Sequence, residues 1–361
     1  MQPLEPSSSP CSSVIRQQRR PWPEVLVITT LAVLLVLGIS IQARAATQHG
    51  RFIGAMPTKY PTWFKESFLE FRDDIEEAAV NGKRVIILFH QDGCPYCNAL
   101  VEKNLSQRDI EELLLQNFDV IAINIWGDRE VVSVAEQSFS EKQFAVALKV
   151  QYTPTLIFFN ERAEVALRLN GYLPPAEFKL ALEYVAGKHE QQVSYRDYIA
   201  NRQLPRRSSQ VVTASAFVST QSRDADKPTV VLFEQRDCPN CETLHERVFA
   251  LPETRRLLNG FNRQRVDMWS DQIVQTPSGE KVTGRDWAAT LSVNYAPSLI
   301  VFDPKGREVI RTSAYFKRFH TLGVLRYAAS GAFRQEPSFQ RYLNSHAEAL
   351  RAQGQDVNIW D

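Results

Sequence analysis

The sequence contains the same six-residue turn twice, each time shortly after an apolar segment. Asp92–Cys97 reads DGCPYC and comes two residues after VIILF, whereas Arg236–Cys241 reads RDCPNC and comes two residues after VVLF. The first cysteines of the two turns are 144 residues apart, and so are the second cysteines. A motif that recurs at a fixed distance indicates a chain built from repeated structural units.

The repetition extends well beyond the cysteines. A set of aromatic positions recurs 143 residues later: Trp126, Tyr152, Tyr172 and Tyr184 return as Trp269, Tyr295, Tyr315 and Tyr327. The segment SYRDYI (194–199) resembles SFQRYL (338–343), again 144 residues further on. One residue deleted between the cysteines and the tryptophan explains the change of spacing. We infer a duplication, and a length of 361 residues agrees with two domains.

Both copies have the same coarse layout. A strand-like run (84–89 and 229–233) leads into the cysteine pair, which opens a helix, and a proline heads a later strand (154–159 and 297–302). A further helix in each copy has an N-terminal capping pattern, Ser140 with Gln143 and Thr283 with Asp286. Alternating strands and helices predict an α/β fold in which helices cover the faces of a sheet.

The N-terminal segment predicts export. Residues 1–24 are rich in Ser and Pro and carry a basic region, and an uncharged apolar run follows from Val25 to Ile41, with Ala-Arg-Ala at 43–45. Residues 25–45 are therefore expected to be a signal peptide or, because the run is long enough to approach a bilayer span, an uncleaved transmembrane anchor. Either alternative predicts a periplasmic location for the remainder, soluble or anchored to the inner membrane.

Composition excludes one class of partner. Lys plus Arg (42) nearly equals Asp plus Glu (41), so no basic excess indicates a nucleic-acid surface. Five cysteines are present, and four of them form the two Cys-x-x-Cys pairs, as an oxidising compartment favours. The fifth, Cys11, precedes the apolar run, and we assign it no function.

The spacing of each pair suits thiol–disulfide exchange. Two cysteines three positions apart at a helix start lie one turn from each other, close enough to form a disulfide. The first, Cys94 or Cys238, meets free backbone N–H groups that favour its thiolate, and the second, Cys97 or Cys241, is placed to resolve the mixed disulfide. The prolines between them, Pro95 and Pro239, fit the first helical turn.

Other roles for the cysteines are less consistent with the sequence. A structural bridge across two residues removes little chain entropy, and a zinc site of four thiolates would join pairs that each follow a separate strand. Inert remnants of redox sites are a third alternative. We expect no metal, nucleotide or glutathione site, and no cofactor other than the redox-active disulfides Cys94–Cys97 and Cys238–Cys241.

Two further positions lie near the cysteines in this interpretation. Pro154 and Pro297 each head a strand, where the missing N–H is tolerated. A cis bond there lets the preceding residue, Thr153 or Ala296, present its backbone to an extended peptide. An ordinary proline at a strand edge is the alternative.

The motifs resemble the thioredoxin superfamily, and more closely the exported thioredoxin-like proteins of the SoxW type associated with bacterial sulfur oxidation. The resemblance rests on GCPYC, NIWGDREV (124–131), YTPTLIFF (152–159), LRLNGYLPPAEF (167–178) and the closing LEYV. It implies two tandem thioredoxin-like domains, each a central mixed sheet flanked by helices, with cis prolines at 154 and 297. It also implies reduction of disulfides in exported proteins, with electrons from a membrane thiol-transfer protein.

The sequence departs from ordinary thioredoxins around the cysteines. Gly93 and Pro95-Tyr96 replace the usual Trp and Gly-Pro, and Pro-Tyr is the dipeptide of glutaredoxins, which predicts a less reducing site. The acid that thioredoxins bury in the preceding strand is absent. The group that deprotonates the resolving thiol is therefore open. His90 and Glu234, which end the equivalent strands, are candidates for it, and a solvated or merely structural role is the alternative. His245, four residues after Cys241, is expected to be a surface residue.

These observations predict a first domain at 56–190, a linker with a short helix at 191–226 that packs on the first copy, and a second domain at 227–361. The function expected is an exported reductase of protein disulfides, whose two sites differ in potential and serve different partners or pass electrons between them. Two alternatives stay open. One is a periplasmic oxidase or isomerase, and the other is a binding or chaperone-like module whose second domain is not catalytic.

Overall fold

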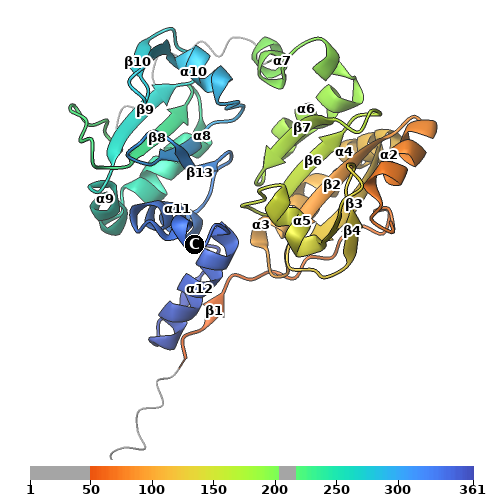
Figure 1. The fold of residues 1–361 in the computed structure, drawn as a ribbon, viewed down its shortest axis with the longest axis horizontal. Helices are drawn as coiled ribbons and strands as arrows, with labels where there is room; N and C mark the ends of the chain where they lie inside the picture. Colours follow the sequence, from red (N-terminus) through yellow and green to blue (C-terminus); the bar gives the residue numbers. More distant parts are fainter. Residues whose placement is uncertain (1–48, 203–216) are drawn as a thin grey trace, which may run out of the picture. The chain divides into compact units, whose positions relative to one another are not determined.

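The computed structural model describes residues 49–202 and 217–361 (Figure 1). The expected signal peptide or anchor at 25–45 lies outside these residues. Within the described ranges, no helix has the length and apolar character needed to cross a membrane.

The first copy contains a complete α/β unit. Its elements are α2 (Phe71–Val80), β2 (Arg84–His90), α3 (Pro95–Ala99), the π-helical η1 (Leu100–Leu105), α4 (Arg108–Asn117), β3 (Phe118–Asn124), β4 (Glu130–Val132), β5 (Ser138–Ser140), α5 (Glu141–Ala147), β6 (Thr155–Phe159), β7 (Val165–Asn170), α6 (Pro175–Ala186), η2 (His189–Gln191) and α7 (Tyr195–Arg202).

Its sheet has the order β3-β2-β6-β7 and is mixed, because β2 pairs parallel with β3 but antiparallel with β6. Strand β2 is central, so both of its faces are covered and its apolar run does not alternate with polar residues. One face packs against α3, α4 and α6 through residues such as Leu88 and Phe178, and the other packs against α2 and α5 through residues such as Ile87 and Phe144.

The elements of the second copy repeat this order from β2 onward and end with an additional strand. They are β8 (Thr229–Glu234), α8 (Pro239–Leu244), the π-helical η3 (His245–Phe249), α9 (Pro252–Leu258), β9 (Asn262–Asp267), β10 (Ile273–Gln275), β11 (Lys281–Thr283), α10 (Gly284–Thr290), β12 (Ser298–Phe302), β13 (Glu308–Thr312), α11 (Arg318–Ala329), η4 (Ala332–Arg334), α12 (Phe339–Ala352) and β14 (Val357–Asn358).

The second sheet, β9-β8-β12-β13, has the same pairing as the first: β8 is parallel to β9 and antiparallel to β12. One face packs against α8, η3, α9 and α11 through residues such as Leu232 and Val248, and the other packs against α10 through Phe233 and Trp287. Two α/β domains with mixed sheets flanked by helices confirm the predicted fold class.

Local sequence signals account for the helix starts before β6 and β12. Ser140 accepts a hydrogen bond from the backbone of Gln143, whose side chain bonds back to the Ser140 amide, and Thr283 accepts from the backbone of Asp286. Both predicted caps are confirmed. They satisfy amides that have no partner inside the helix.

Several elements were not expected from the sequence. A polar segment follows β3 in the first copy and β9 in the second. Each of these segments forms a short antiparallel hairpin, β4–β5 in the first copy and β10–β11 in the second. Strand β1 (Phe52–Ile53) pairs parallel with β14, which lies more than 300 residues away in the chain. Phe217, in the segment predicted to be linker, packs against Phe249 of the second copy. The short helix that was expected in this segment is α7, which packs Tyr198 against Tyr184 of α6 in the first copy, as predicted.

Candidate active sites

Both cysteine pairs lie at the first turn of a helix that follows a central strand. Cys94 caps α3 and Cys238 caps α8, and each sulfur accepts a hydrogen bond from the backbone nitrogen of the second cysteine, at 3.0 Å for Cys97 and 3.1 Å for Cys241. Each pair forms a disulfide, with Cα atoms 5.3 Å apart in the first and 5.2 Å apart in the second. The helix start therefore supplies a backbone donor to the sulfur of the attacking cysteine.

The residue before each first cysteine has a left-handed backbone. Gly93 has φ of +72° and Asp237, its equivalent, has φ of +51°. Glycine enters this region without steric cost, and aspartate is one of the few other residues that visits it with any frequency. Gly93 and Asp237 therefore both suit the backbone conformation of the turn.

The cis-proline loops lie beside the cysteines. The peptide bonds Thr153–Pro154 and Ala296–Pro297 are cis. Cys94 Sγ lies 3.5 Å from the Thr153 carbonyl oxygen, and the Thr153 hydroxyl donates to the same sulfur at 3.3 Å. Ala296 has no hydroxyl, so the second site lacks this donor. The two sites therefore stabilise negative charge on the first sulfur to different extents.

The residue between the proline and the second cysteine of each pair makes different contacts in the two sites. Tyr96 is buried, its ring meets Phe316 and Trp360 edge-on, and its hydroxyl accepts a hydrogen bond of 2.9 Å from the Lys317 backbone nitrogen. Burial raises the pKa of Tyr96, so it stays neutral. In the second site Asn240 takes this place and donates to the Tyr295 hydroxyl at 2.7 Å.

A tryptophan–glutamine pair recurs at both sites. The indole nitrogen of Trp126 donates to Gln91 at 2.8 Å, and that of Trp269 donates to Gln235 at 3.0 Å. Each glutamine comes three residues before the first cysteine, so the hydrogen bond fixes the turn that leads into the site. The tryptophans were identified from their repeated spacing, whereas the glutamines were not, although they too recur at a spacing of 144.

The two candidate modulators have unlike surroundings. His90 is half-buried against Tyr60, and its Nδ1 has no hydrogen-bond partner among the described residues. Burial lowers the pKa of His90, although the carboxylates of Asp92 and Glu141 oppose that effect. The net effect of these surroundings disfavours protonation of the imidazole.

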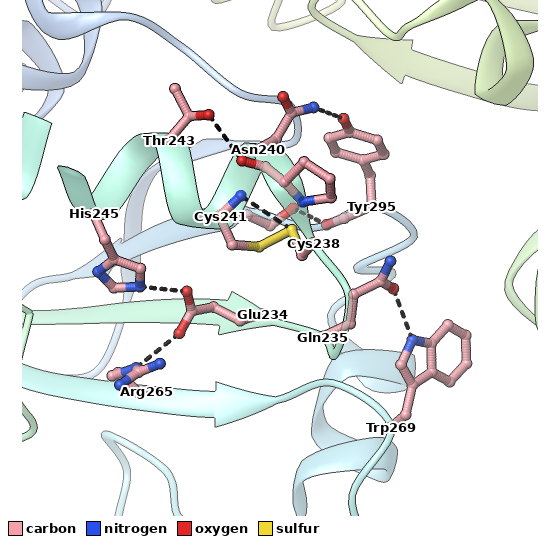
Figure 2. The surroundings of a disulfide bond; sticks show 12 residues. Glu234, Gln235, Cys238, Asn240, Cys241, Thr243, His245, Arg265, Trp269 and Tyr295 are labelled. Carbon is pink, nitrogen blue, oxygen red and sulfur yellow. Dashed lines mark hydrogen bonds and ion pairs between the residues drawn. A yellow bond between two sulfur atoms is a disulfide. The ribbon is translucent and has the colours of Figure 1, made fainter. Parts of the chain in front are cut away.

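Glu234 is buried between His245 and Arg265 (Figure 2). One carboxylate oxygen lies 2.5 Å from His245 Nε2, and the other accepts from Arg265 Nε at 2.7 Å. The expectation that His245 is a surface residue is wrong: it is 2% exposed. Its ring packs against Phe249 on the helix face that covers the sheet. Arg265 was not identified from the sequence, because its relation to Glu234 arises only from the parallel pairing of β8 with β9.

Among the described residues, no group of three or more His, Cys, Asp or Glu side chains is arranged to hold a metal ion. The chemistry available at each site is that of the sulfur atoms, a backbone donor at the helix start and the cis-proline loop. This chemistry is that of a thiol–disulfide oxidoreductase.

Comparisons with known proteins agree with the fold. A model of the thioredoxin-like domain matches residues 71–186 and 220–329. No curated protein sequence matches the chain.

Solved structures with similarity include a thioredoxin-fold protein from Helicobacter pylori, at 22% identity over 34% of this chain and 85% of that one, with a TM-score of 0.31. A thioredoxin from Thermus thermophilus has 24% identity over 39% of this chain and 89% of that one, with a TM-score of 0.28. The DsbD C-terminal domain of Neisseria meningitidis has 13% identity over 36% of this chain and 99% of that one, with a TM-score of 0.25. At these scores the likenesses support no functional argument. The two family matches together span more than half of the chain, which therefore belongs to the thioredoxin-like family and carries two domains of that family in tandem.

Proposed function

We propose that the protein is an exported reductase of protein disulfides that uses both cysteine pairs. The observation that carries the proposal is the first site: Cys94 caps a helix and receives the Thr153 hydroxyl at 3.3 Å, beside a cis proline. These donors favour the thiolate of Cys94, which is the species that attacks a disulfide.

The reaction transfers two electrons to the substrate. The Cys94 thiolate attacks one sulfur of a substrate disulfide, and the second substrate sulfur leaves as a thiolate that takes up a proton. Cys97 then loses its proton and attacks Cys94, so the Cys94–Cys97 bond forms and the remaining substrate sulfur is released as a thiolate. The substrate is reduced and the protein is left in the disulfide form that the structure shows.

The same steps are proposed for Cys238 and Cys241. The helix start, the cis proline and the preceding turn of the second site match those of the first site. Ala296 and Asn240, in place of Thr153 and Tyr96, change the hydrogen-bond donors of the second site. Sites with unlike donors are expected to have unlike potentials, because any interaction that favours the thiolate form changes the balance between dithiol and disulfide. We therefore propose that the two sites serve different partners or pass electrons between them.

The proposed partners and location rest on the N-terminal sequence and on the resemblance. The basic region and the apolar run Val25–Ile41 support export to the periplasm, as a soluble protein or attached to the inner membrane. The substrates would be exported proteins that contain disulfides, and re-reduction of the two sites would come from a thiol-transfer protein of the membrane.

The test is turnover of a model protein disulfide with a small dithiol as the electron source. Three variants of the exported chain are compared with the parent: Cys94→Ser with Cys97→Ser, Cys238→Ser with Cys241→Ser, and all four together. We expect each double variant to keep part of the activity and the quadruple variant to lose it. If loss of the second pair leaves turnover unchanged but abolishes capture of partners, the second domain is a binding module.

A further inference from the structure

The first cysteine pair is covered by residues from the C-terminal part of the chain. The ring of Tyr96 meets three aromatic rings edge-on, with ring centroids 5.0–5.2 Å apart, namely those of Phe316, His320 and Trp360. The Tyr96 hydroxyl also accepts a hydrogen bond of 2.9 Å from the Lys317 backbone nitrogen. We call residues 314–320 together with Trp360 the cover.

The cover also contacts the loops that flank the first cysteine. Phe316 packs on the ring of Tyr152, at a centroid distance of 4.8 Å. A Cβ atom at Gly171 would lie 3.0 Å from the Ala314 Cβ atom and 3.0 Å from the Phe316 ring, so the cover approaches this backbone as closely as glycine permits. The Gly171 nitrogen donates to the Pro154 carbonyl oxygen at 2.8 Å, which places this contact beside the cis-proline loop.

Trp360, near the end of the chain, is held to the rest of the cover. Lys317 Nζ donates a hydrogen bond of 2.8 Å to the Trp360 carbonyl oxygen and lies 4.2 Å from the centroid of the indole ring. A cation over an indole face is attracted by the electron density of the ring. The Phe319 backbone nitrogen donates to the Asp361 carbonyl oxygen at 3.3 Å. Trp360 and residues 314–320 therefore form one continuous surface against Tyr96.

The residues between the two cysteines are buried in the first pair and open in the second. Pro95 and Tyr96 are both buried, whereas Pro239 is exposed and Asn240 is half-buried. A cavity of about 500 Å³ lies beside the turn that leads into the second pair. Both copies build the same helix start, so the burial of Tyr96 does not follow from the fold of one copy. It comes from the cover.

This burial matters because a protein partner needs more than the sulfur atom. A protein–protein interface of standard size buries about 800 Å² on each partner. A partner that exchanges thiols with the first site therefore has to occupy the surface around Cys94, including Tyr96 and the loop of Gly171. The cover occupies that surface in the disulfide form. A small thiol has no such requirement.

We propose that the cover keeps protein partners away from the oxidised first site and has to move before a partner can reduce the Cys94–Cys97 disulfide. In that reduction a donor thiolate attacks Cys94 Sγ, the bond to Cys97 breaks, and Cys97 leaves as a thiolate that takes up a proton. The second donor thiol loses its proton and displaces Cys94, so that a donor disulfide forms and two electrons reach the pair. The second site reacts without this opening step.

The proposal rests on the proposed function, in which a thiol-transfer protein reduces both sites again after turnover. It assigns the two sites different access to the same donor. The second site is open to a protein donor at all times, and the first site becomes open only in the fraction of molecules whose cover has moved. A substitution that weakens the cover raises that fraction and with it the rate of reduction.

The experiment uses the exported chain with Cys238→Ser and Cys241→Ser, so that only the first site reacts. The oxidised protein is mixed with an excess of either dithiothreitol or a reduced bacterial thioredoxin. Samples are quenched with acid, free thiols are alkylated, and the mass of the chain gives the fraction reduced at each time. Dithiothreitol is the small donor and thioredoxin is the protein donor.

Two substitutions weaken the cover without changing the cysteines or the cis-proline loop. Phe316→Ala and Trp360→Ala each remove one ring that packs on Tyr96. Phe68→Ala is the matched control, because the Phe68 side chain is 97% exposed. Trp360→Ala is also placed in the chain with Cys94→Ser and Cys97→Ser, where the second site alone reacts. A melting curve of each variant establishes that it is folded.

We expect each cover variant to raise the rate with the protein donor about three- to tenfold, because one aromatic pair shifts the population of the open form by about that factor. The rise with dithiothreitol is expected to be smaller, and Phe68→Ala is expected to behave like the parent. In the chain that keeps only the second pair, Trp360→Ala should leave the rate unchanged.

The proposal is overturned if the protein donor reduces the first site equally fast in the parent and in the folded cover variants. A gain of the same size in Phe68→Ala, or at the second site of Trp360→Ala, would also overturn it, because the effect would then be a general loosening of the chain. If dithiothreitol reduces the first pair in none of the variants, the proposed function of that site fails instead, so the two failures are distinguishable.

Discussion

The side-chain amide of Asn240 donates a hydrogen bond of 2.7 Å to the hydroxyl of Tyr295 (Figure 2). This bond joins the residue between the second pair of cysteines to the residue before Ala296 and its cis peptide. It links the two loops that form the second site. In the first copy the corresponding residues, Tyr96 and Tyr152, both pack against Phe316 instead.

The substitution Tyr295→Phe tests this link. It removes the acceptor and leaves the aromatic ring in place. Net hydrogen bonds of this kind contribute about 0.5–1.5 kcal/mol, so the free energy of unfolding is expected to fall by that amount. Urea denaturation of the oxidised protein measures the change. Tyr172→Phe is the control, because the Tyr172 hydroxyl has no hydrogen-bond partner among the described residues. A loss as large in the control as in Tyr295→Phe would show that the hydrogen bond is not the cause.

The Thr153 hydroxyl is expected to activate Cys94. In Thr153→Ala the sulfur loses the donor at 3.3 Å, and a smaller thiolate fraction should slow alkylation of reduced Cys94 about three- to tenfold at neutral pH. The reciprocal change Ala296→Thr supplies a hydroxyl at the second site and should speed alkylation of Cys238. Both rates are measured in chains whose other cysteine pair is replaced by serine. Equal rates in Thr153→Ala and the parent would mean that the hydroxyl does not act on the sulfur.

A third expectation concerns acid stability of the first domain. Arg84, whose side chain is buried, bonds Glu161 at 2.9 Å and Glu190 at 2.8 Å, and the hydrogen bond from Arg84 lowers the pKa of Glu161 to about 2. A carboxyl whose pKa is lower in the folded state stabilises the fold above its unfolded pKa, and this stability is lost as pH falls toward the folded value. The loss from this group is therefore expected between about pH 4.5 and pH 2.

The matched variants are Glu161→Gln and, as control, Glu102→Gln at an exposed position of η1. Urea denaturation at several acidic pH values gives the free energy of unfolding for each. Glu161→Gln should be less stable than the parent near neutrality, and the difference should narrow as the solution is acidified. A difference that is constant with pH would show that the Arg84 contact does not govern ionisation of Glu161.

Much of the fold could be predicted because the chain contains two copies of each signal. A strand, a cysteine pair and a proline-headed strand appear twice at nearly the same spacing, so each copy supports the interpretation of the other. The caps at Ser140 and Thr283 are local patterns that need no tertiary information. The hairpins β4–β5 and β10–β11 were missed because strands of three residues in polar segments have too few positions to show alternation.

The surroundings of the second site could not be predicted in the same way. His245 reads as a polar residue on a helix, and only packing of that helix on β8 places it against Glu234. Arg265 comes from a strand whose register against β8 is a tertiary property. The expected surface position of His245 was wrong. A histidine can be buried when it has a hydrogen-bond partner, but the partner of His245, Glu234, lies eleven residues earlier in a different element, so their contact could not be recognised from the sequence. The SoxW-type kinship stays a prediction.

The central claim is that both cysteine pairs reduce protein disulfides by thiol–disulfide exchange. A redox titration of each pair, measured separately, tests this claim most directly. One chain carries Cys94→Ser and Cys97→Ser, and the other carries Cys238→Ser and Cys241→Ser. The account predicts reversible titration of both, with potentials of about −200 to −270 mV and a measurable gap between them. Potentials of about −120 to −180 mV at both sites would contradict it and indicate an oxidase or isomerase, and a pair that does not titrate reversibly would not be a redox site.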